Sequence, residues 1–264
     1  MAVLRKTPKM VSIPNSFCPG CGHGILNRLI AEVIEENGYE DKTILTLGVG
    51  CSCNMNMSWN GDKIQTAHGR GAATAMGIKV ARPDLLSIAY QGDGDAYVIG
   101  LAETMNAAYR NENITVFVVN NNNFGMTGGQ MSWTTMPDQK TTTSVHGRDT
   151  NWTGMPIKLP EMIASLPNVA YVARGSVQSP KEIRKLRKYV KNAIEAQLNN
   201  EGYSLVEVLA PCPTNWGMNV ESALNWMKEE VLPYFALGEL RERRSKNGLE
   251  KTIEASERSS CGGK

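Results

Sequence analysis

The stretch of the chain from residue 85 to residue 123 reads LLSIAYQGDGDAYVIGLAETMNAAYRNENITVFVVNNNN. Leu85 to Gln91 is a short apolar run, which we expect to be a buried strand that ends at Gly92-Asp93-Gly94. Tyr97 to Arg110 has the pattern of a helix, and Ile114 to Asn120 is a strong apolar, β-branched strand. Two continuous apolar strands joined by a helix are typical of a parallel sheet that is covered on both faces. The stretch therefore predicts an α/β fold.

The flanking sequence continues this pattern in both directions. We expect helices at residues 24–37, 69–81 and 180–198, and further strands at residues 43–49, 169–172 and 204–209. The result is an open, mostly parallel sheet with helices on both faces, in one domain of residues 1–238, followed by a charged C-terminal tail at residues 239–264. Residues 121–159 are rich in Asn, Gly, Thr and Pro, and a loop of this length is usually functional.

Oxygen ligands occur at the ends of the two central predicted strands. The glycines of Gly92-Asp93-Gly94 permit a close approach to a phosphate, and the carboxylate can hold a hard cation. Taken alone, this tripeptide could equally be a plain turn. Asn120 to Asn123 follow the next strand and bring amide oxygens to the same edge of the sheet. A carboxylate and an amide there form half of an octahedral magnesium site, which diphosphate oxygens and water would complete.

Six cysteines indicate a second kind of site. In a reducing compartment they are more often metal ligands or redox groups than disulfides. Cys18-Pro-Gly-Cys21 could be half of a zinc ribbon or a dithiol pair, but no second Cys-x-x-Cys follows and no predicted strand precedes it. A [4Fe–4S] centre, which usually requires four cysteines, fits better. Its expected ligands are Cys18, Cys21, one of Cys51 and Cys53, and Cys212. We expect Cys261 and the remaining member of the Cys51/Cys53 pair to be structural thiols.

The composition argues against several classes of function. The chain has 264 residues with 28 Lys and Arg against 26 Asp and Glu, and its net charge of +2 gives no support for binding to nucleic acid or to an anionic membrane. Met1 to Phe17 lacks the apolar core of a signal peptide, and no apolar stretch approaches the ~20 residues of a membrane span. We therefore expect a cytoplasmic protein without a nucleic-acid or membrane partner.

The chain resembles the thiamine diphosphate enzymes, whose signature is Gly-Asp-Gly followed after a fixed interval by Asn-Asn. In more detail, it resembles the β subunit of the 2-oxoacid:ferredoxin oxidoreductases from about Phe17 to Gly238. The motifs that carry this resemblance are CPGCGHG (18–24), GVGCSC (48–53), AHGRGAATAMGIK (67–79), YQGDGDAYVIG (90–100), NNNNFGMTGGQMS (120–132), QKTTTSVHGRD (139–149) and APCPTNWGM (210–218). The resemblance implies the thiamine diphosphate-binding fold.

The resemblance also implies the site residues. The magnesium ligands would be the side chains of Asp93 and Asn121 and the backbone carbonyl of Asn123. The ligands of one [4Fe–4S] cluster would be Cys18, Cys21, Cys51 and Cys212. The residues that line thiamine diphosphate would be Val49, Gly50, Cys51, Ser52, His68, Gly92, Gly94, Asp95, Gly125, Met126 and Thr127. His68 would be the catalytic residue, whereas a histidine beside a Gly-rich helix start is more often a structural hydrogen-bonding group.

The implied reaction is the oxidative decarboxylation of a 2-oxoacid to acyl-CoA and CO₂, with coenzyme A as the acyl acceptor and ferredoxin as the electron acceptor. The glutamate that contacts the aminopyrimidine ring would come from a separate α subunit. Further γ and ferredoxin-like δ subunits would complete a hetero-oligomer, so this chain alone is expected to be inactive. Residues 125–132, 139–143 and 212–218 look most like the 2-oxoisovalerate and 2-oxoglutarate types, and less like the pyruvate type.

Three other functions compete with this interpretation. A non-oxidative thiamine decarboxylase or synthase subunit would keep the magnesium motif but has no need of four placed cysteines. A metal-binding assembly scaffold without catalysis would explain the cysteines but not Asp93 together with Asn121. A nicotinamide dehydrogenase would need a Gly-x-Gly-x-x-Gly after a strand, and Gly92-x-Gly94 is next followed by glycine at Gly100.

Overall fold

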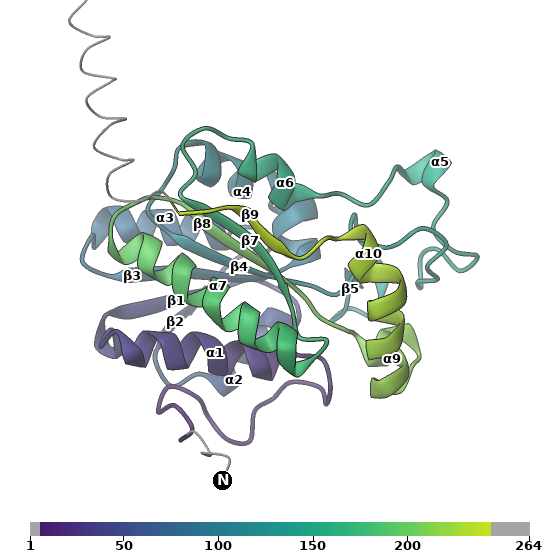
Figure 1. Ribbon diagram of the computed structural model, residues 1–264, viewed down its shortest axis with the longest axis horizontal. Coiled ribbons are helices and arrows are strands. Elements are labelled where there is room, and N and C mark those ends of the chain that lie inside the picture. The colour runs from purple at the N-terminus through teal and green to yellow at the C-terminus, as the bar shows by residue number, and fades with distance from the viewer. Residues whose placement is uncertain (1–5, 244–264) are drawn as a thin grey trace, which may run out of the picture.

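The computed structural model describes residues 6–243, and residues 1–5 and 244–264 lie outside this description. Within the described residues, the central sheet has seven strands in the order β2-β1-β3-β4-β8-β7-β9 (Figure 1). All its neighbours are parallel except β7 and β9. The strands are β1 (Thr43–Leu47), β2 (Asp62–Gln65), β3 (Leu86–Gly92), β4 (Thr115–Asn120), β7 (Tyr171–Ser176), β8 (Ser204–Leu209) and β9 (Gly238–Arg241). The predicted α/β class with a mostly parallel sheet is confirmed.

Helices cover both faces of this sheet, as the sequence predicted. One core cluster packs α1 (His23–Glu36) and α7 (Pro180–Leu198) on one face. A second cluster packs α3 (Gly71–Ala81), α4 (Leu101–Tyr109) and α6 (Leu159–Ala164) on the other. The shorter helices are α2 (Met55–Ser58), α5 (Thr150–Thr153), α8 (Pro213–Trp216), α9 (Val220–Trp226) and α10 (Leu232–Tyr234).

The helix expected at residues 97–110 begins differently from the prediction. A π-helical turn, Gly94–Ile99, follows directly on Gly92-Asp93, and the regular helix α4 starts only at Leu101. The amide of Gly100 donates to the carbonyl of Asp95 at 2.8 Å, and a Cβ atom on Gly100 would lie 2.4 Å from the carbonyl oxygen of Gly69. This close approach of two backbones requires glycine, and π-helical turns of this kind are frequent at functional sites.

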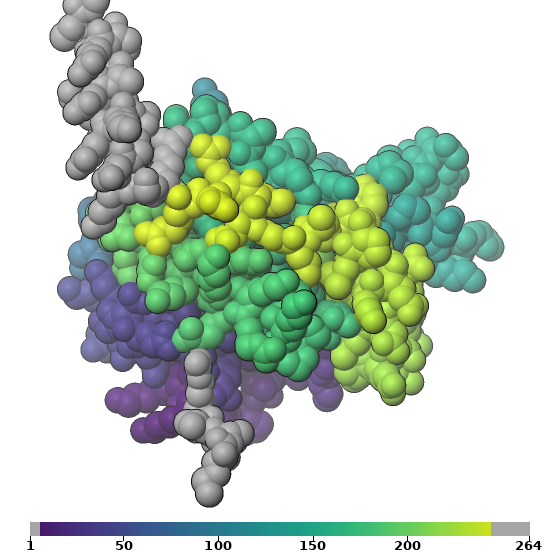
Figure 2. Space-filling model, viewed as in Figure 1, coloured from purple at the N-terminus to yellow at the C-terminus, as the bar shows by residue number. Residues whose placement is uncertain are grey.

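The long segment from residue 121 to residue 159 is partly ordered by its own contacts. It contains a small hairpin of β5 (Asn123–Phe124) and β6 (Gln130–Met131), and α5 projects from the body of the protein (Figure 2). Arg148 lies in this segment and is only 3 % exposed. Its guanidinium donates to the carbonyls of Trp133 and Thr135, so it fixes the turn that faces the end of β3.

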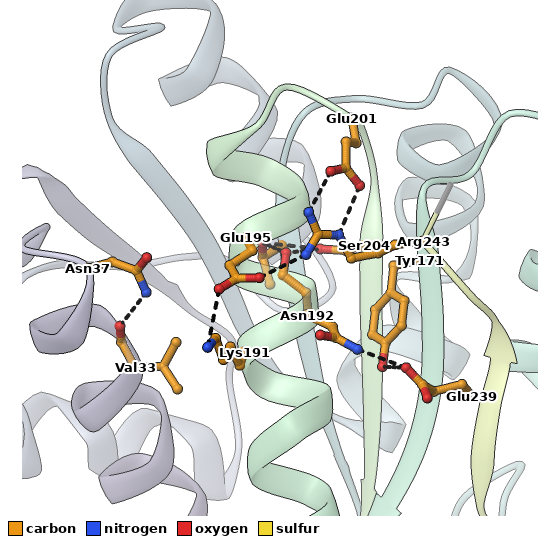
Figure 3. A network of polar contacts seen from close by, with 12 residues as sticks. Val33, Asn37, Tyr171, Lys191, Asn192, Glu195, Glu201, Ser204, Glu239 and Arg243 are labelled. Carbon is orange, nitrogen blue, oxygen red and sulfur yellow. Dashed lines mark hydrogen bonds and ion pairs between the residues drawn. The ribbon is translucent and has the colours of Figure 1, made fainter. Parts of the chain in front are cut away.

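Strand β9 crosses the boundary that we expected after residue 238. It adds an antiparallel edge to β7, and its Glu239 accepts hydrogen bonds from Tyr171 at 2.9 Å and from Asn192 at 2.8 Å (Figure 3). Arg243 pairs with Glu195 and Glu201 at the end of the described chain. Residues 239–243 therefore belong structurally with the sheet. The rest of the expected tail, with Cys261, lies outside the described residues and stays a prediction.

In the stretch from residue 6 to residue 243, none of the helices has the length and apolar character that crossing a lipid bilayer would demand.

Candidate functional site

A cavity opens where β1, β3 and β4 end, at the edge of the sheet where a parallel α/β fold usually binds its ligand. The turns after these three strands supply most of its wall. Its lining includes Val49, Gly50, Cys51, His68, Gly92, Asp93, Gly94, Asp95, Asn121, Asn123, Gly125, Met126 and Thr127. Most residues that the resemblance implied for the cofactor are thus brought together around one cavity. Ser52, which was also expected there, is buried outside this lining and donates its hydroxyl to the carbonyl of Gly48 at 3.0 Å.

Asp93 presents its two carboxylate oxygens to different surroundings. The side chain is 2 % exposed. Its Oδ2 accepts hydrogen bonds from the hydroxyls of Ser132, at 2.7 Å, and of Thr134. These two hydroxyls lie on the turn that Arg148 holds from behind. Because Oδ2 is tied in this way, Oδ1 is the oxygen that remains to face a ligand in the cavity.

Three oxygen atoms, one of which is Asp93 Oδ1, lie close together in the cavity. The carboxamide oxygen of Asn121 lies 3.3 Å from Asp93 Oδ1 and 2.8 Å from the backbone carbonyl oxygen of Asn123. Each of these atoms is a hydrogen-bond acceptor. Turning the amide over would place its NH₂ group between the two acceptors and satisfy them. A hard cation would satisfy the unturned arrangement equally well, because magnesium prefers carboxylate and carbonyl oxygens. The residues expected to hold magnesium therefore fit such an ion.

A pH dependence of stability follows from the burial of Asp93. Burial raises the pKa of its carboxyl from 3.8 to about 6, although hydrogen bonds from Thr134 and Ser132 oppose the rise. The folded chain thus holds this proton more tightly than the unfolded chain. The contribution of the Asp93 carboxyl to the free energy of unfolding therefore falls as the pH rises from about 4 to about 6, and it stays low at higher pH. With divalent cations removed, we expect the free energy of unfolding of Asp93→Asn to be about 2–3 kcal/mol larger than that of the wild type at neutral pH. This value follows from about 1.4 kcal/mol for each unit by which the pKa is raised.

Urea denaturation of both proteins across this pH range measures the difference. The two curves should approach one another at about pH 4, where the wild-type carboxyl is largely protonated in the folded chain. A difference that does not change with pH would show that the burial of this charge is not its cause.

His68 and Asp95 form a second polar pair in the cavity. His68 Nδ1 contacts Asp95 Oδ1, which also accepts from the backbone amide of Gly69 at 2.7 Å. Asp95 Oδ2 accepts from Gln91 Nε2 at 2.5 Å. Because the buried carboxylate orients the ring through Nδ1, Nε2 is the ring nitrogen that can exchange a proton with a ligand. The side chain of His68 is 32 % exposed, so the ring is reached from the cavity.

Close packing around this pair explains two residues of the motifs. A Cβ atom on Gly48 would lie 2.1 Å from Asp95 Oδ2, so only glycine lets the end of β1 pass beside the carboxylate. A Cβ atom on Gly94 would lie 2.3 Å from the ring of Phe124. That ring, in turn, meets His68 edge to face with the ring centres 6.3 Å apart. Phe124 was missed from the sequence, although its place between Asn123 and Gly125 is a local signal for it.

A second cavity adjoins the first and is lined by four cysteines. Cys18, Cys21, Cys51 and Cys212 all contribute to its wall, together with Phe17 and Asn215. Asn215 Nδ2 lies 3.4 Å from Cys212 Sγ and donates to the carbonyl of Gly125 at 2.7 Å. Cys53 is half-buried and is not part of this lining. Of the two candidates for the third ligand, the fold thus brings Cys51 to the other cysteines.

The cysteines in this cavity perturb each other. Burial raises the pKa of the Cys51 thiol to about 12, and Cys212, Cys21 and Cys18 add to the rise. Burial also raises the pKa of Cys21. The repulsion that neighbouring thiolates exert on Cys51 and Cys21 would be relieved by a cationic metal centre, because metal binding deprotonates its thiol ligands. Among residues 6–243, no group of three His, Cys, Asp or Glu side chains converges tightly enough for a single metal ion. The four cysteines expected to ligate a cluster do line the same cavity.

Sequence reasoning missed several residues that support these cavities. Ser132 and Thr134 hold Asp93, and Gln91 holds Asp95, but hydroxyl and amide side chains in loops carry no signal of such a role. His23 lines both cavities, is 2 % exposed, and lies with Nδ1 2.7 Å from the hydroxyl of Tyr90. His23 differs from the other three in that its place in the CPGCGHG motif made it a weak candidate from sequence.

Comparison with known proteins identifies related sequences. Residues 48–208 match the model of the C-terminal thiamine pyrophosphate-binding domain of thiamine pyrophosphate enzymes. Ketoisovalerate oxidoreductase subunit VorA of Methanothermobacter thermautotrophicus is 42 % identical over 227 residues, which cover 86 % of this chain and 48 % of the relative. The chain thus spans about half the length of this relative. 2-Oxoglutarate synthase subunit KorB of Archaeoglobus fulgidus is 35 % identical over 220 residues, which cover 82 % of this chain and 77 % of the relative.

A solved structure has a similar fold over nearly the whole chain. It is the 2-oxoglutarate:ferredoxin oxidoreductase from Magnetococcus marinus with 2-oxoglutarate, coenzyme A and succinyl-CoA bound. The TM-score is 0.72 at 27 % sequence identity, and the superposition covers 99 % of this chain and 92 % of that one.

Proposed function

The chain belongs to the thiamine pyrophosphate enzymes, as a β-type subunit of the 2-oxoacid:ferredoxin oxidoreductases, and from this premise we propose that it binds thiamine diphosphate, Mg²⁺ and one [4Fe–4S] cluster. The reaction that we assign to its complex is the oxidative decarboxylation of a 2-oxoacid to acyl-CoA and CO₂. Coenzyme A accepts the acyl group and ferredoxin accepts the electrons.

One observation carries this proposal, namely that the two cavities share a wall. Cys51, Asn121, Gly125 and Met126 line both of them. A thiamine site and a cluster site that meet across single residues allow electrons to pass directly from one to the other. A non-oxidative decarboxylase or synthase would not need two adjoining sites of this kind. We therefore rank the non-oxidative function second.

The roles of this chain's residues follow from their geometry. Asp93 Oδ1, Asn121 Oδ1 and the carbonyl of Asn123 would hold Mg²⁺ and through it the diphosphate. When bound, thiamine diphosphate supplies an electron sink for decarboxylation, and a [4Fe–4S] cluster accepts electrons one at a time. His68 Nε2 would exchange a proton with the bound ligand, while Asp95 keeps the ring oriented. Phe124 and Met126 would help to exclude water from the pocket. Cys18, Cys21, Cys51 and Cys212 would ligate the cluster.

The substrate and the partners are part of the same proposal. We favour a 2-oxoisovalerate-type or 2-oxoglutarate-type substrate over pyruvate, because the names of the relatives point the same way as the motifs. An α subunit would supply the glutamate for the aminopyrimidine ring. The γ and ferredoxin-like δ subunits would carry electrons onward, since the four clustered cysteines of this chain serve one cluster. We place the complex in the cytoplasm, where unpaired cysteines are retained in reduced form.

Metal analysis of the complex, purified without oxygen, tests the oxidative function. After correction for the clusters of the other subunits, we expect about four iron and four sulfide per copy of this chain, as for one [4Fe–4S] centre. With coenzyme A present, 2-oxoisovalerate or 2-oxoglutarate should then support faster ferredoxin reduction than pyruvate does. If the analysis found zinc and no sulfide, the four cysteines would hold a structural metal beside the thiamine site. That result would contradict the oxidative mechanism.

A further inference from the structure

Two of the four consecutive asparagines have no part in the magnesium site as described. Asn120 is 1 % exposed and lies at the end of β4, immediately before Asn121. Its Nδ2 donates to Glu207 Oε1 at 3.0 Å, and its Oδ1 accepts from the backbone amide of Asn122 at 3.1 Å. One side chain thus connects β8 to the backbone of the turn that carries the proposed metal ligands.

Asn122 gives this turn its unusual shape. Its φ angle is +60°, a left-handed conformation that asparagine tolerates better than most residues. Its Nδ2 donates to the carbonyl of Thr134 at 2.8 Å, and its own carbonyl accepts from the hydroxyl of Thr135 at 2.6 Å. These bonds join the turn to the same loop whose hydroxyls hold Asp93. Both sides of the three-oxygen site are therefore fixed by one connected set of hydrogen bonds.

Behind Asn120 lies a buried ion pair. Glu207 on β8 and Arg174 on β7 have fully buried side chains, and Arg174 Nε contacts Glu207 Oε2. Arg174 also donates to both carboxylate oxygens of Glu161 on α6, at 2.6 and 2.7 Å. Removing one partner of a buried pair is costly, and such a pair seldom contributes stability in proportion to that cost. The position of this ion pair suggests a role beyond stability. Arg174 Nε contacts Glu207 Oε2, and the other carboxylate oxygen, Oε1, accepts the hydrogen bond from Asn120.

We propose that Asn120 and Glu207 are positioning residues that set the Mg²⁺ affinity of the site formed by Asp93, Asn121 and Asn123. This inference rests on the proposed function. The Arg174–Glu207 pair anchors Glu207, Glu207 anchors Asn120, and Asn120 holds the backbone of the turn that presents two oxygen ligands. Residues that orient metal ligands in this way typically change metal affinity by about 10- to 100-fold when they are mutated.

The test is a Mg²⁺ titration of thiamine diphosphate binding to the intact complex, with a urea unfolding curve for each variant. We expect Asn120→Ala to weaken the apparent Mg²⁺ affinity by about 10-fold or more, and saturating Mg²⁺ to restore turnover to nearly the wild-type value. Glu207→Gln should also weaken it, because the single amide oxygen of glutamine can accept from either Arg174 or Asn120. This second variant keeps the proposal testable if Asn120→Ala does not fold.

Gln197→Ala is the matched control. Gln197 is 1 % exposed and links α7 to Ser87 of β3 through two hydrogen bonds of 2.8 Å, near the opposite end of the sheet. It should lower stability without changing Mg²⁺ affinity. A wild-type affinity in Asn120→Ala, or an equal loss in Gln197→Ala, would overturn the inference. If the wild type bound thiamine diphosphate equally well without Mg²⁺, the proposed magnesium site would be wrong, and the inference would fall with it.

Discussion

Asp93→Ala is expected to abolish Mg²⁺-dependent binding of thiamine diphosphate while the iron content of the complex stays unchanged. The substitution removes the only carboxylate among the three oxygens that meet in the cavity, and with it the charge that offsets a divalent cation. It also leaves the hydroxyls of Ser132 and Thr134 without their acceptor. The cysteine cavity does not include Asp93 in its lining, so cluster assembly should proceed.

Binding of thiamine diphosphate, measured by calorimetry with and without Mg²⁺, and iron per chain are the two readouts. Asp84→Ala is the control, because Asp84 also carries a carboxylate beside β3 but lies exposed at the other end of the strand, where it pairs with Arg82. It should leave both readouts unchanged. Normal Mg²⁺-dependent cofactor binding by Asp93→Ala would show that the magnesium ligand has been assigned wrongly.

Cys51→Ser is expected to lose the iron–sulfur cluster, whereas Cys53→Ser is expected to retain it. Both cysteines lie in one short turn, Cys51–Asn54, and both are half-buried, so a general effect on folding should be similar for the two. The two cysteines differ in their surroundings. Cys51 lines the cavity with Cys18, Cys21 and Cys212, whereas Cys53 is not part of this lining. A serine in place of a ligand thiolate removes one of four bonds to the cluster.

Iron and acid-labile sulfide in each anaerobically purified complex, together with the visible absorption of the cluster, measure the outcome. Cys53→Ser serves as the matched control for Cys51→Ser. The reverse pattern would reassign the third ligand to Cys53. Retention of the full iron content in both variants would remove the turn after β1 from the cluster site altogether.

The buried parts of the fold could be predicted because their sequences carry a local signal. Strand β8 and helix α7 were predicted with the bounds that the structure shows. A run of Leu and Val interrupted only by Glu207, and an amphipathic repeat preceded by a serine, are visible in the chain itself. The edge strands β2 (DKIQ) and β9 (GELR) were missed. Their polar residues are those of a loop, and they become strands only because a neighbouring strand offers hydrogen bonds.

The site shows the same division between local and tertiary information. The residue types of Asp93 and of the asparagine run indicated a magnesium site. Four identical residues do not by themselves distinguish ligands from supports, and the assignment of Asn121 and Asn123 came from the family resemblance. The fold separates them, because Asn122 adopts a left-handed conformation and Asn120 turns back to Glu207. Arg148 is a further example, since nothing in its sequence neighbourhood indicates that its guanidinium is buried against backbone carbonyls.

By itself, then, the sequence determined the α/β class, the edge of the sheet that bears the site, and the residue types available there, because apolar periodicity and motif spacing are properties of the chain. Only the tertiary structure showed how the expected asparagines and cysteines are placed around the cavities, that the two cavities share a wall, and that a buried ion pair lies behind the turn of the proposed metal ligands. Those features depend on the meeting of segments that lie far apart in sequence, such as residues 120, 174 and 207, and no local pattern encodes such a meeting.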